Sequence, residues 1–353
     1  MRQRRDPRNA GGSPSPGPCP VGPAGRVGGV GGDPSRARPR SGGRSGDRAF
    51  RGLALLAGTA VLGVLVAITF FLVVRALPAF RADTVSFWTT TVWQPDASPA
   101  AFGIAALAFG TALSSLLALT LAFPVAMGAA LFITDVAPRR LAAVLGHVVD
   151  TLAAVPSVVF GLWGLYWLAP RLTGPQQWLH RNLGFIPLFR APEGVPSPSR
   201  SIFVVAVVLA IMILPIIVAV VRETIRQVDP GLREAALALG ATRWEVVRAA
   251  VLPSARAGIA GAVMLGLGRA LGETIAVALV LGSTFDINAQ ILVPGKNTIA
   301  ANIANQFGEA GSTGRAALIA SGLVLFAMTT AVSLLARATI RRTGRAHRRE
   351  PVR

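Results

Sequence analysis

The stretch LALLAGTAVLGVLVAITFFLVV, residues 53–74, decides the class of fold of this chain. It contains 22 residues and no charge. A helix rises about 1.5 Å per residue, so roughly 20 apolar residues are enough to cross a hydrocarbon core of about 30 Å. The run exceeds the roughly 7 to 15 residues of a signal-peptide core, and it follows a long polar tail. It therefore predicts a helix that stays in the membrane.

Five further apolar runs share the length and composition of the first. They cover residues 104–133, 141–168, 202–221, 257–282 and 316–336. With 52% hydrophobic and 14% charged residues, the chain is too apolar for the surface of a soluble protein. We therefore expect an all-α membrane protein with six transmembrane helices. The runs contain Pro124, Pro156 and Pro215, which predict kinks because proline removes a backbone hydrogen-bond donor.

The regions outside the spans are strongly basic, and their charge predicts the orientation. Residues 1–50 contain 12 Gly, 8 Pro and 10 Arg, and we expect a disordered tail there. Residues 51–340 then form the transmembrane domain, and residues 341–353 form a second basic tail. One side of the membrane would carry 26 basic residues and the other 8. The positive-inside rule places both termini in the cytoplasm and makes this a multi-pass protein of the cytoplasmic membrane.

Several kinds of chemistry are not indicated by the sequence. Topology accounts for the net charge of +19, so we expect membrane lipid and no nucleic acid as a partner. Cys19 is alone, and the three histidines lack metal-ligand spacing, so no metal site is expected. The single lysine, Lys296, does not stand in a phosphate-binding P-loop pattern. No catalytic constellation is apparent, and energy for any transport would come from another subunit or from an ion gradient.

The loop at residues 222–256 is rich in helix punctuation. An Asp-Pro pair at 229–230 opens a short helix that Gly240 ends. A T-x-x-E capping box at 242–245 opens a second helix, which Pro253 is expected to stop. Such a pair serves as a DNA-binding motif, as a packing motif or as a docking site for a cytoplasmic partner. Its acidic residues and its short connections to the membrane spans disfavour DNA, and docking is the favoured interpretation.

Two ionisable residues interrupt the run 257–282. Arg269 lies 12 residues beyond Ala257, about 18 Å into the span and close to its midplane. Glu273 follows four residues later, on the same helical face. Either the two charges neutralise each other and hold helices together, or Arg269 offers a transient site for an anion that Glu273 orients. The second interpretation is favoured because a guanidinium has donors to spare and suits a tetrahedral oxyanion.

Two further features of the spans have alternative explanations. Asp150 lies some nine residues into the third run, where it is a candidate for the same pathway or an acceptor of local hydrogen bonds. Gly261, Gly268 and Gly272 surround the charged pair, and we expect them to permit close helix crossing.

The cytoplasmic loop resembles that of the permease subunits of ABC importers. Their loop has the pattern E-A-A, three residues, Gly, and later a hydrophobic residue and Pro. The corresponding residues here are Glu234, Ala235, Ala236, Gly240, Leu252 and Pro253. The resemblance implies the type I importer fold and a coupling helix that fits a groove on a separate ATPase subunit. ATP and magnesium would bind that subunit, so no cofactor is expected in this chain.

A closer resemblance, over residues 50–340, is to the phosphate-specific permease family of the PstC type. It rests on LGLGRALGETIAV at 265–277 and DTLAAVPSVVFGLWG at 150–164. The resemblance implies inorganic phosphate import with a second related permease, two ATPase subunits and an extracytoplasmic phosphate-binding protein. Within this interpretation, Arg269 and Glu273 are the candidate residues of the substrate pathway, and Asp150 is a further candidate. A permease for sulfate or molybdate remains an alternative, and a secondary carrier driven by an ion gradient is a more distant one.

Overall fold

The structure is a computed structural model, and it describes residues 44–190 and 200–347. Most of the tail expected at 1–50 and the end of the tail at 341–353 lie outside the described residues. The chain divides into two units, Met1–Ala60 and Val61–Arg353. In the first unit, the described residues form the N-terminal part of a helix that continues into the second. Everything below concerns the second unit.

Helices account for nearly all of the described secondary structure. The α-helices are α1 (Arg44–Ala82), α2 (Ala105–Leu131), α3 (Arg139–Ala153), α4 (Ser157–Trp163), α5 (Ala169–Leu183), α6 (Ile202–Arg226), α7 (Pro230–Ala238), α8 (Arg243–Val246), α9 (Leu252–Gly272), α10 (Ile275–Val280), α11 (Ile299–Gln306) and α12 (Ser312–His347). Three π-helical turns, η2 (Phe132–Val136), η3 (Gly164–Leu168) and η5 (Val247–Val251), and one 3-10 turn, η4 (Pro187–Phe189), continue or follow them. Strands β1 (Trp93–Gln94) and β2 (Ala101–Phe102) pair antiparallel, with Trp93 opposite Phe102.

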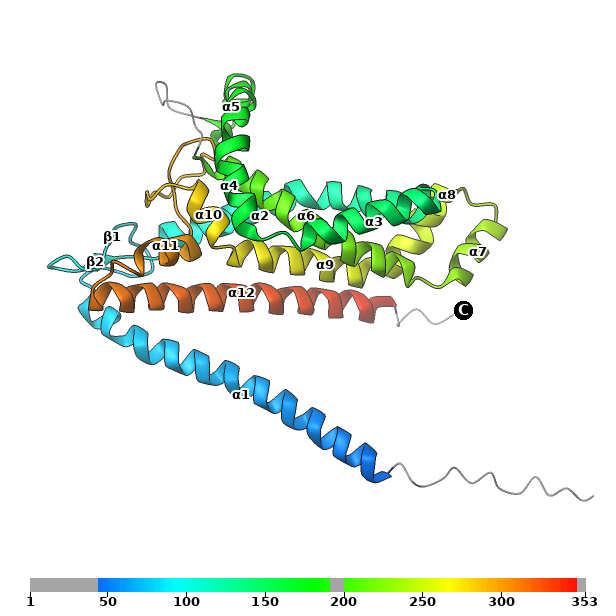
Figure 1. The fold of residues 1–353 in the computed structure, drawn as a ribbon, viewed down its shortest axis with the longest axis horizontal. Coiled ribbons are helices and arrows are strands. Elements are labelled where there is room, and N and C mark those ends of the chain that lie inside the picture. Colours follow the sequence, from blue (N-terminus) through cyan, green and yellow to red (C-terminus); the bar gives the residue numbers. More distant parts are fainter. Residues whose placement is uncertain (1–43, 191–199, 348–353) are drawn as a thin grey trace, which may run out of the picture. The chain divides into compact units, whose positions relative to one another are not determined.

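The expected all-helical membrane fold is confirmed. In the described ranges five helices are long and apolar enough to cross a membrane, and a bent pair makes a sixth span if it counts as one. Figure 1 shows α2, α3, α6, α9 and α12 running side by side, with α7 and α8 at one end of this bundle. The bundle supports both regions that the sequence analysis singled out, one among its helices and one at its end.

The third expected span is not one straight helix. α3 and the helix formed by α4, η3 and α5 meet at an angle of 91°. Pro156 lies at this break, and its ring keeps the preceding residue out of the helical region. Pro124 and Pro215, by contrast, lie inside the continuous helices α2 and α6. The kink predicted at Pro156 is therefore present, and it is sharp enough to divide the run 141–168 into two helices.

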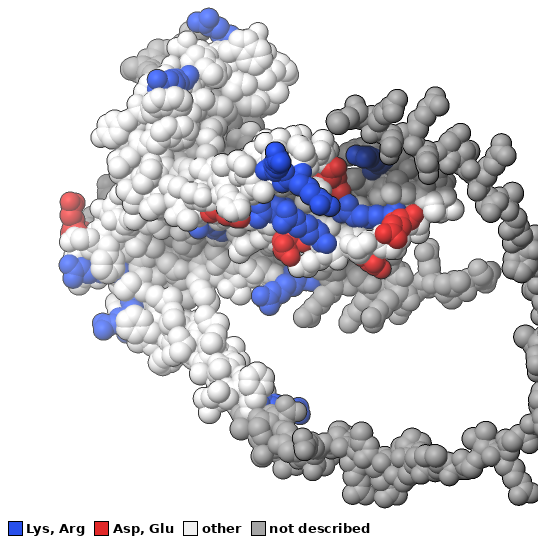
Figure 2. All heavy atoms as spheres, turned by 45° about the vertical axis from the view of Figure 1, so that its right-hand side comes forward, with Lys and Arg blue, Asp and Glu red and all other residues white. Residues whose placement is uncertain are grey.

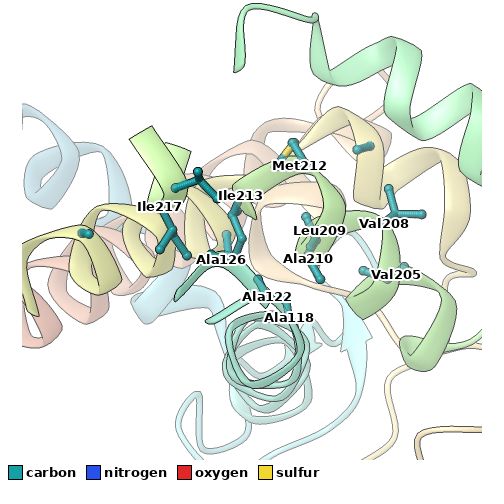
Figure 3. Packing of buried hydrophobic residues seen from close by; sticks show 14 of the residues in the cluster. Ala118, Ala122, Ala126, Val205, Val208, Leu209, Ala210, Met212, Ile213 and Ile217 are labelled. Carbon is teal, nitrogen blue, oxygen red and sulfur yellow. The ribbon is translucent and has the colours of Figure 1, made fainter. Parts of the chain in front are cut away.

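The core of the bundle is the contact between α2 and α6. α2 contributes a row of alanines at every fourth position, namely Ala118, Ala122, Ala126 and Ala130, each at most 1% exposed. Figure 3 shows three of them facing the large apolar side chains of α6, among them Leu209, Ile213 and Ile217. Small residues on one helix allow the other to approach closely, which favours packing in a membrane, where apolar burial alone provides little drive. Helix α9 packs against both helices of this pair.

At the other end of the bundle, the segment between α10 and α11 is fixed to the start of α6. The backbone N–H of Phe203 donates to Ile291 O at 3.0 Å, and that of Gly295 donates to Arg200 O at 3.0 Å. Lys296 is 3% exposed and adopts a positive φ of 65°. Its Nζ donates to the carbonyl oxygens of Asn288 and Gln290, both at 2.7 Å. Hydrogen bonds from Lys296, the single lysine of the chain, therefore hold this segment together.

Candidate functional site

Arg269 lines an open groove of about 680 Å³. The groove lies between α9 and α12, with one residue of α6, and its lining is Ile216, Gly261, Met264, Leu265, Gly268, Arg269, Ser333, Ala336 and Arg337. The Arg269 side chain is exposed, and no Asp or Glu oxygen of the described residues lies within 4.0 Å of its guanidinium. A cationic group in mostly apolar surroundings, without a protein counter-ion, is suited to an anion.

Two glycines of α9 keep this groove open. A Cβ at Gly261 or at Gly268 would find no atom within 4 Å. The close crossing with α6 occurs elsewhere: a Cβ at Gly266 would lie 2.7 Å from Cδ1 of Ile217, and one at Gly258 would collide with Thr224. The expectation that Gly261, Gly268 and Gly272 permit close crossing is therefore wrong within this chain. Gly258 and Gly266, which are eight residues apart, face the neighbouring helix α6. Gly268 and Gly272, which have G-x-x-x-G spacing, do not.

Glu273 does not share a helix with Arg269, as the sequence analysis assumed. α9 ends at Gly272, and Glu273 has extended backbone angles, φ −69° and ψ 125°. Its Oε1 accepts the N–H of Ala276 at 3.3 Å, in the first turn of α10. The apolar run continues through this point, so periodicity gave no sign of the break. Neither mutual neutralisation nor same-face orientation of the pair is observed, and Glu273 serves as a cap for α10.

Asp150 is brought to Arg222 rather than to Arg269. The Arg222 Nη2 lies 3.1 Å from Asp150 Oδ1, and this ion pair joins α3 to α6. Gly146 makes room for the guanidinium, because a Cβ there would lie 2.5 Å from Nη1 of Arg222. The Asp150 side chain is still 56% exposed. In the sequence, Arg222 is the first residue of the loop 222–256 and contributes only to the charge that predicts the orientation. The signal that could have identified Arg222 is its position directly after the apolar run 202–221.

The helix pair predicted in the loop 222–256 forms largely as expected. Asp229 caps α7 by accepting the N–H of Gly231 at 2.9 Å, and Gly240 adopts a φ of 85° after the helix. Thr242 and Glu245 form the reciprocal capping box. Pro253, however, does not stop the second helix. Pro253 lacks a backbone N–H, and the π turn η5 just before it accommodates this missing donor within the helix. As a result, α8, η5 and α9 form one continuous helix of 30 residues, Arg243–Gly272.

The surface of this pair is apolar at its tip and charged around it. Leu237, Leu239 and Trp244 are 51%, 89% and 63% exposed. Glu234 and Ala235 are exposed beside them, whereas Ala236 is half-buried against the bundle. Figure 2, in which this end of the bundle is turned forward, shows Arg and acidic side chains gathered there. Exposed large apolar side chains rimmed by charge are typical of a protein contact surface.

Arg233 joins α7 to the bundle. Its Nη1 pairs with Asp135 in η2, at the end of α2, and its Nη2 donates to Ile225 O near the end of α6 at 3.2 Å. Both partners are parts of the α2–α6 core pair. Sequence reasoning named the neighbouring Glu234 but not Arg233, because the partner Asp135 lies 98 residues away in the chain. The described ranges contain no cluster of three metal-ligating side chains.

The comparisons with known proteins agree with this arrangement. Residues 122–345 match the family described as binding-protein-dependent transport system inner membrane component. The phosphate transport system permease protein PstC 2 of Mycobacterium tuberculosis (strain ATCC 25618 / H37Rv) is 46% identical over 299 residues, 84% of this chain and 92% of that protein. PstC of Haemophilus influenzae (strain ATCC 51907 / DSM 11121 / KW20 / Rd) is 39% identical over 293 residues, 82% of this chain and 92% of that protein.

One solved structure shares the fold. It is the crystal structure of a bacterial ABC transporter involved in the import of the acidic polysaccharide alginate, with a TM-score of 0.57, 17% identity, and coverage of 85% of this chain and 98% of that one. The predicted family and the predicted importer fold are thereby confirmed. The chain belongs to the family of binding-protein-dependent transport system inner membrane components, the non-catalytic membrane subunits of ABC transporters.

Proposed function

We propose that this chain is the permease subunit through which an ATP-driven importer passes inorganic phosphate across the cytoplasmic membrane. The observation that carries the proposal is the Arg269 guanidinium, which lines an open groove between α9 and α12 and has no carboxylate counter-ion among the described residues. The relatives with 46% and 39% identity are named phosphate permeases, which supports phosphate over sulfate or molybdate.

The chemistry of the site follows from desolvation. An anion loses its water on entering an apolar groove, and a fixed guanidinium replaces part of that hydration with charge-assisted hydrogen bonds. Weak and transient binding is required, because the anion must also leave. Glu273 caps the helix that follows Arg269, and we propose that its carboxylate also limits the positive charge of the empty pathway. Asp150, which remains half exposed while it pairs with Arg222, is the third acid-base group of the proposed pathway.

The proposed assembly contains a second related permease, two ATPase subunits and an extracytoplasmic phosphate-binding protein. The exposed tip of α7 and α8, with Glu234, Ala235, Ala236 and Gly240, is the proposed contact with an ATPase subunit. Leu252 and Pro253 belong to the same coupling region, at the start of α9. The excess of basic residues on this side supports an orientation with both termini in the cytoplasm. ATP and magnesium would bind the ATPase subunits.

The test is ATP-dependent uptake of labelled phosphate by the reconstituted assembly. The wild-type importer is expected to take up phosphate, with competition by unlabelled phosphate and little by sulfate. Arg269→Ala is expected to abolish uptake, while Arg315→Ala, at an exposed arginine outside the groove, leaves it unchanged. Equal uptake by Arg269→Ala and wild type would exclude the proposed role. Uptake without the ATPase subunits would favour an ion-driven carrier.

Glu273 calls for a separate pair of variants. Glu273→Gln keeps an oxygen that accepts the N–H of Ala276 but removes the charge, whereas Glu273→Ala removes both. If Glu273 carries charge for the pathway, both variants lose uptake. If it only caps α10, Glu273→Gln retains uptake at near the wild-type rate, and the residue leaves the proposed pathway.

A further inference from the structure

A second guanidinium lines the same groove as Arg269. Arg337 lies 25 residues beyond the start of α12. The helix continues past it to His347. Arg337 is exposed, and no Asp or Glu oxygen of the described residues lies within 4.0 Å of it. Two arginines from two different helices therefore border one groove without a protein counter-ion.

This arrangement is unfavourable unless an anion joins it. Like charges that share an apolar groove repel each other more strongly than they do in bulk water, because the effective dielectric is lower. The nearest acid in sequence, Glu273, is used as the cap of α10. A ligand with two negative charges and several acceptor oxygens relieves the repulsion and accepts from both guanidiniums. A doubly charged tetrahedral oxyanion, such as hydrogen phosphate, has these properties.

The two arginines also belong to helices that are connected differently to the cytoplasmic helix pair. Arg269 stands near the end of the 30-residue helix Arg243–Gly272, which begins at the capping box of the cytoplasmic helix pair. Arg337 belongs to α12, which is a separate helix and not a continuation of that pair. A displacement of the helix pair therefore passes along one helix to Arg269 and changes its separation from Arg337. An anion held between them is bound in one state and released in the other.

We propose that Arg337 is the second arm of the anion site, and that the site is split between α9 and α12 so that motion of the cytoplasmic helix pair opens it. The inference rests on the proposed function, since it assigns a further residue to the same pathway. It adds a prediction that the proposed function does not make: loss of Arg337 weakens phosphate binding even though Arg269 is intact.

The test measures labelled phosphate bound by the purified permease–ATPase complex without the binding protein, by equilibrium dialysis. Each charge-assisted contact contributes roughly 10- to 100-fold in affinity. Arg337→Gln is therefore expected to raise the Kd for phosphate at least about tenfold, and Arg337→Lys less, because it keeps the charge but not the fork. Arg315→Gln, on the same helix but outside the groove, is the matched control and is expected to bind as wild type does.

The outcomes separate the inference from the function on which it rests. If Arg337→Gln binds phosphate as wild type does while Arg269→Gln has lost binding, the split site is wrong and the proposed function stands. If the wild-type assembly takes up no phosphate with ATP, the proposed function itself fails. Basal ATP hydrolysis reports assembly of each variant. Should Arg337→Gln not assemble, Arg337→Lys decides, since wild-type affinity in that variant overturns the need for a fork.

Discussion

Lys296 offers a test of a single buried charge. The residue is 3% exposed, and its ammonium donates to two backbone carbonyls. Burial lowers the pKa of Lys296 from 10.5 to about 8, and the nearby Asp286 opposes this shift only in part. Between these two values the unfolded chain holds a proton that the folded chain has lost. The free energy of unfolding therefore rises with pH from about 8 to about 10.5.

Lys296→Met is expected to remove this pH dependence. The wild-type chain should gain stability relative to the variant, by an amount on the order of a few kcal/mol, as the pH passes through this window. Thermal unfolding of the reconstituted proteins at pH 7.5 and at pH 9.5 measures the difference. Below about pH 8 the two slopes should be parallel, because both folded and unfolded Lys296 are protonated. Parallel slopes above pH 8 would contradict the account.

At the scale of helices, two glycines of α9 two positions apart face different neighbours. Gly266 packs against Ile217 of α6, whereas Gly268 borders the open groove. Gly266→Val is expected to destabilise the chain by about 1–3 kcal/mol, because the new side chain would overlap the buried side chain of Ile217. Gly268→Val should leave the melting temperature close to that of wild type but lower the rate of phosphate uptake, because it fills the groove. Differential scanning fluorimetry and uptake assays distinguish the two variants; similar melting temperatures would contradict this assignment of faces.

The ion pair between α3 and α6 supports a second prediction at this scale. Asp150→Arg alone places two guanidiniums together and is expected to reduce uptake and stability. The double variant Asp150→Arg with Arg222→Asp restores the pair in reverse. If the pair only joins the helices, the double variant recovers stability and uptake together. If Asp150 belongs to the anion pathway, stability recovers but uptake does not, and this second result is the one we expect.

These elements also show what the sequence could reveal. Arg269 stands out because a charge in a long apolar run is costly, and the caps at Asp229 and Thr242 are recognised because capping is a local rule. The partner of Asp150 lies 72 residues away, and no local pattern joins it to Arg222. Apolar residues resume directly after the break at Glu273, so neither composition nor periodicity marks a helix end there. Pro253 suggested a helix end, but the helix continues through this residue because the π turn η5 accommodates its missing N–H.

At the scale of the whole molecule, the helix pair α7–α8 has two attachments to the membrane bundle besides its short chain connection to α6. One is covalent, through the continuous helix that carries Arg269. The other is Arg233, which pairs with Asp135 and donates to Ile225 O, and so fixes α7 to the ends of α2 and α6. In the proposed assembly, an ATPase binds at the exposed tip, and we propose that its force reaches the core pair through Arg233 and the groove through α9. We therefore expect that loss of either attachment separates ATP hydrolysis from transport.

Arg233→Ala is therefore expected to uncouple the importer. The apolar tip at Leu239 and Trp244 is unchanged, so the ATPase subunits should still bind and hydrolyse ATP. The number of phosphate ions imported per ATP should fall severalfold, because α7 moves without the bundle. Arg226→Ala, at an exposed arginine at the end of α6, is the control and should keep the wild-type ratio. The ratio is measured in proteoliposomes from phosphate uptake and ATP hydrolysis in the same sample. If both rates fall together in Arg233→Ala, the residue supports assembly, and transmission between the tip and the bundle does not depend on it.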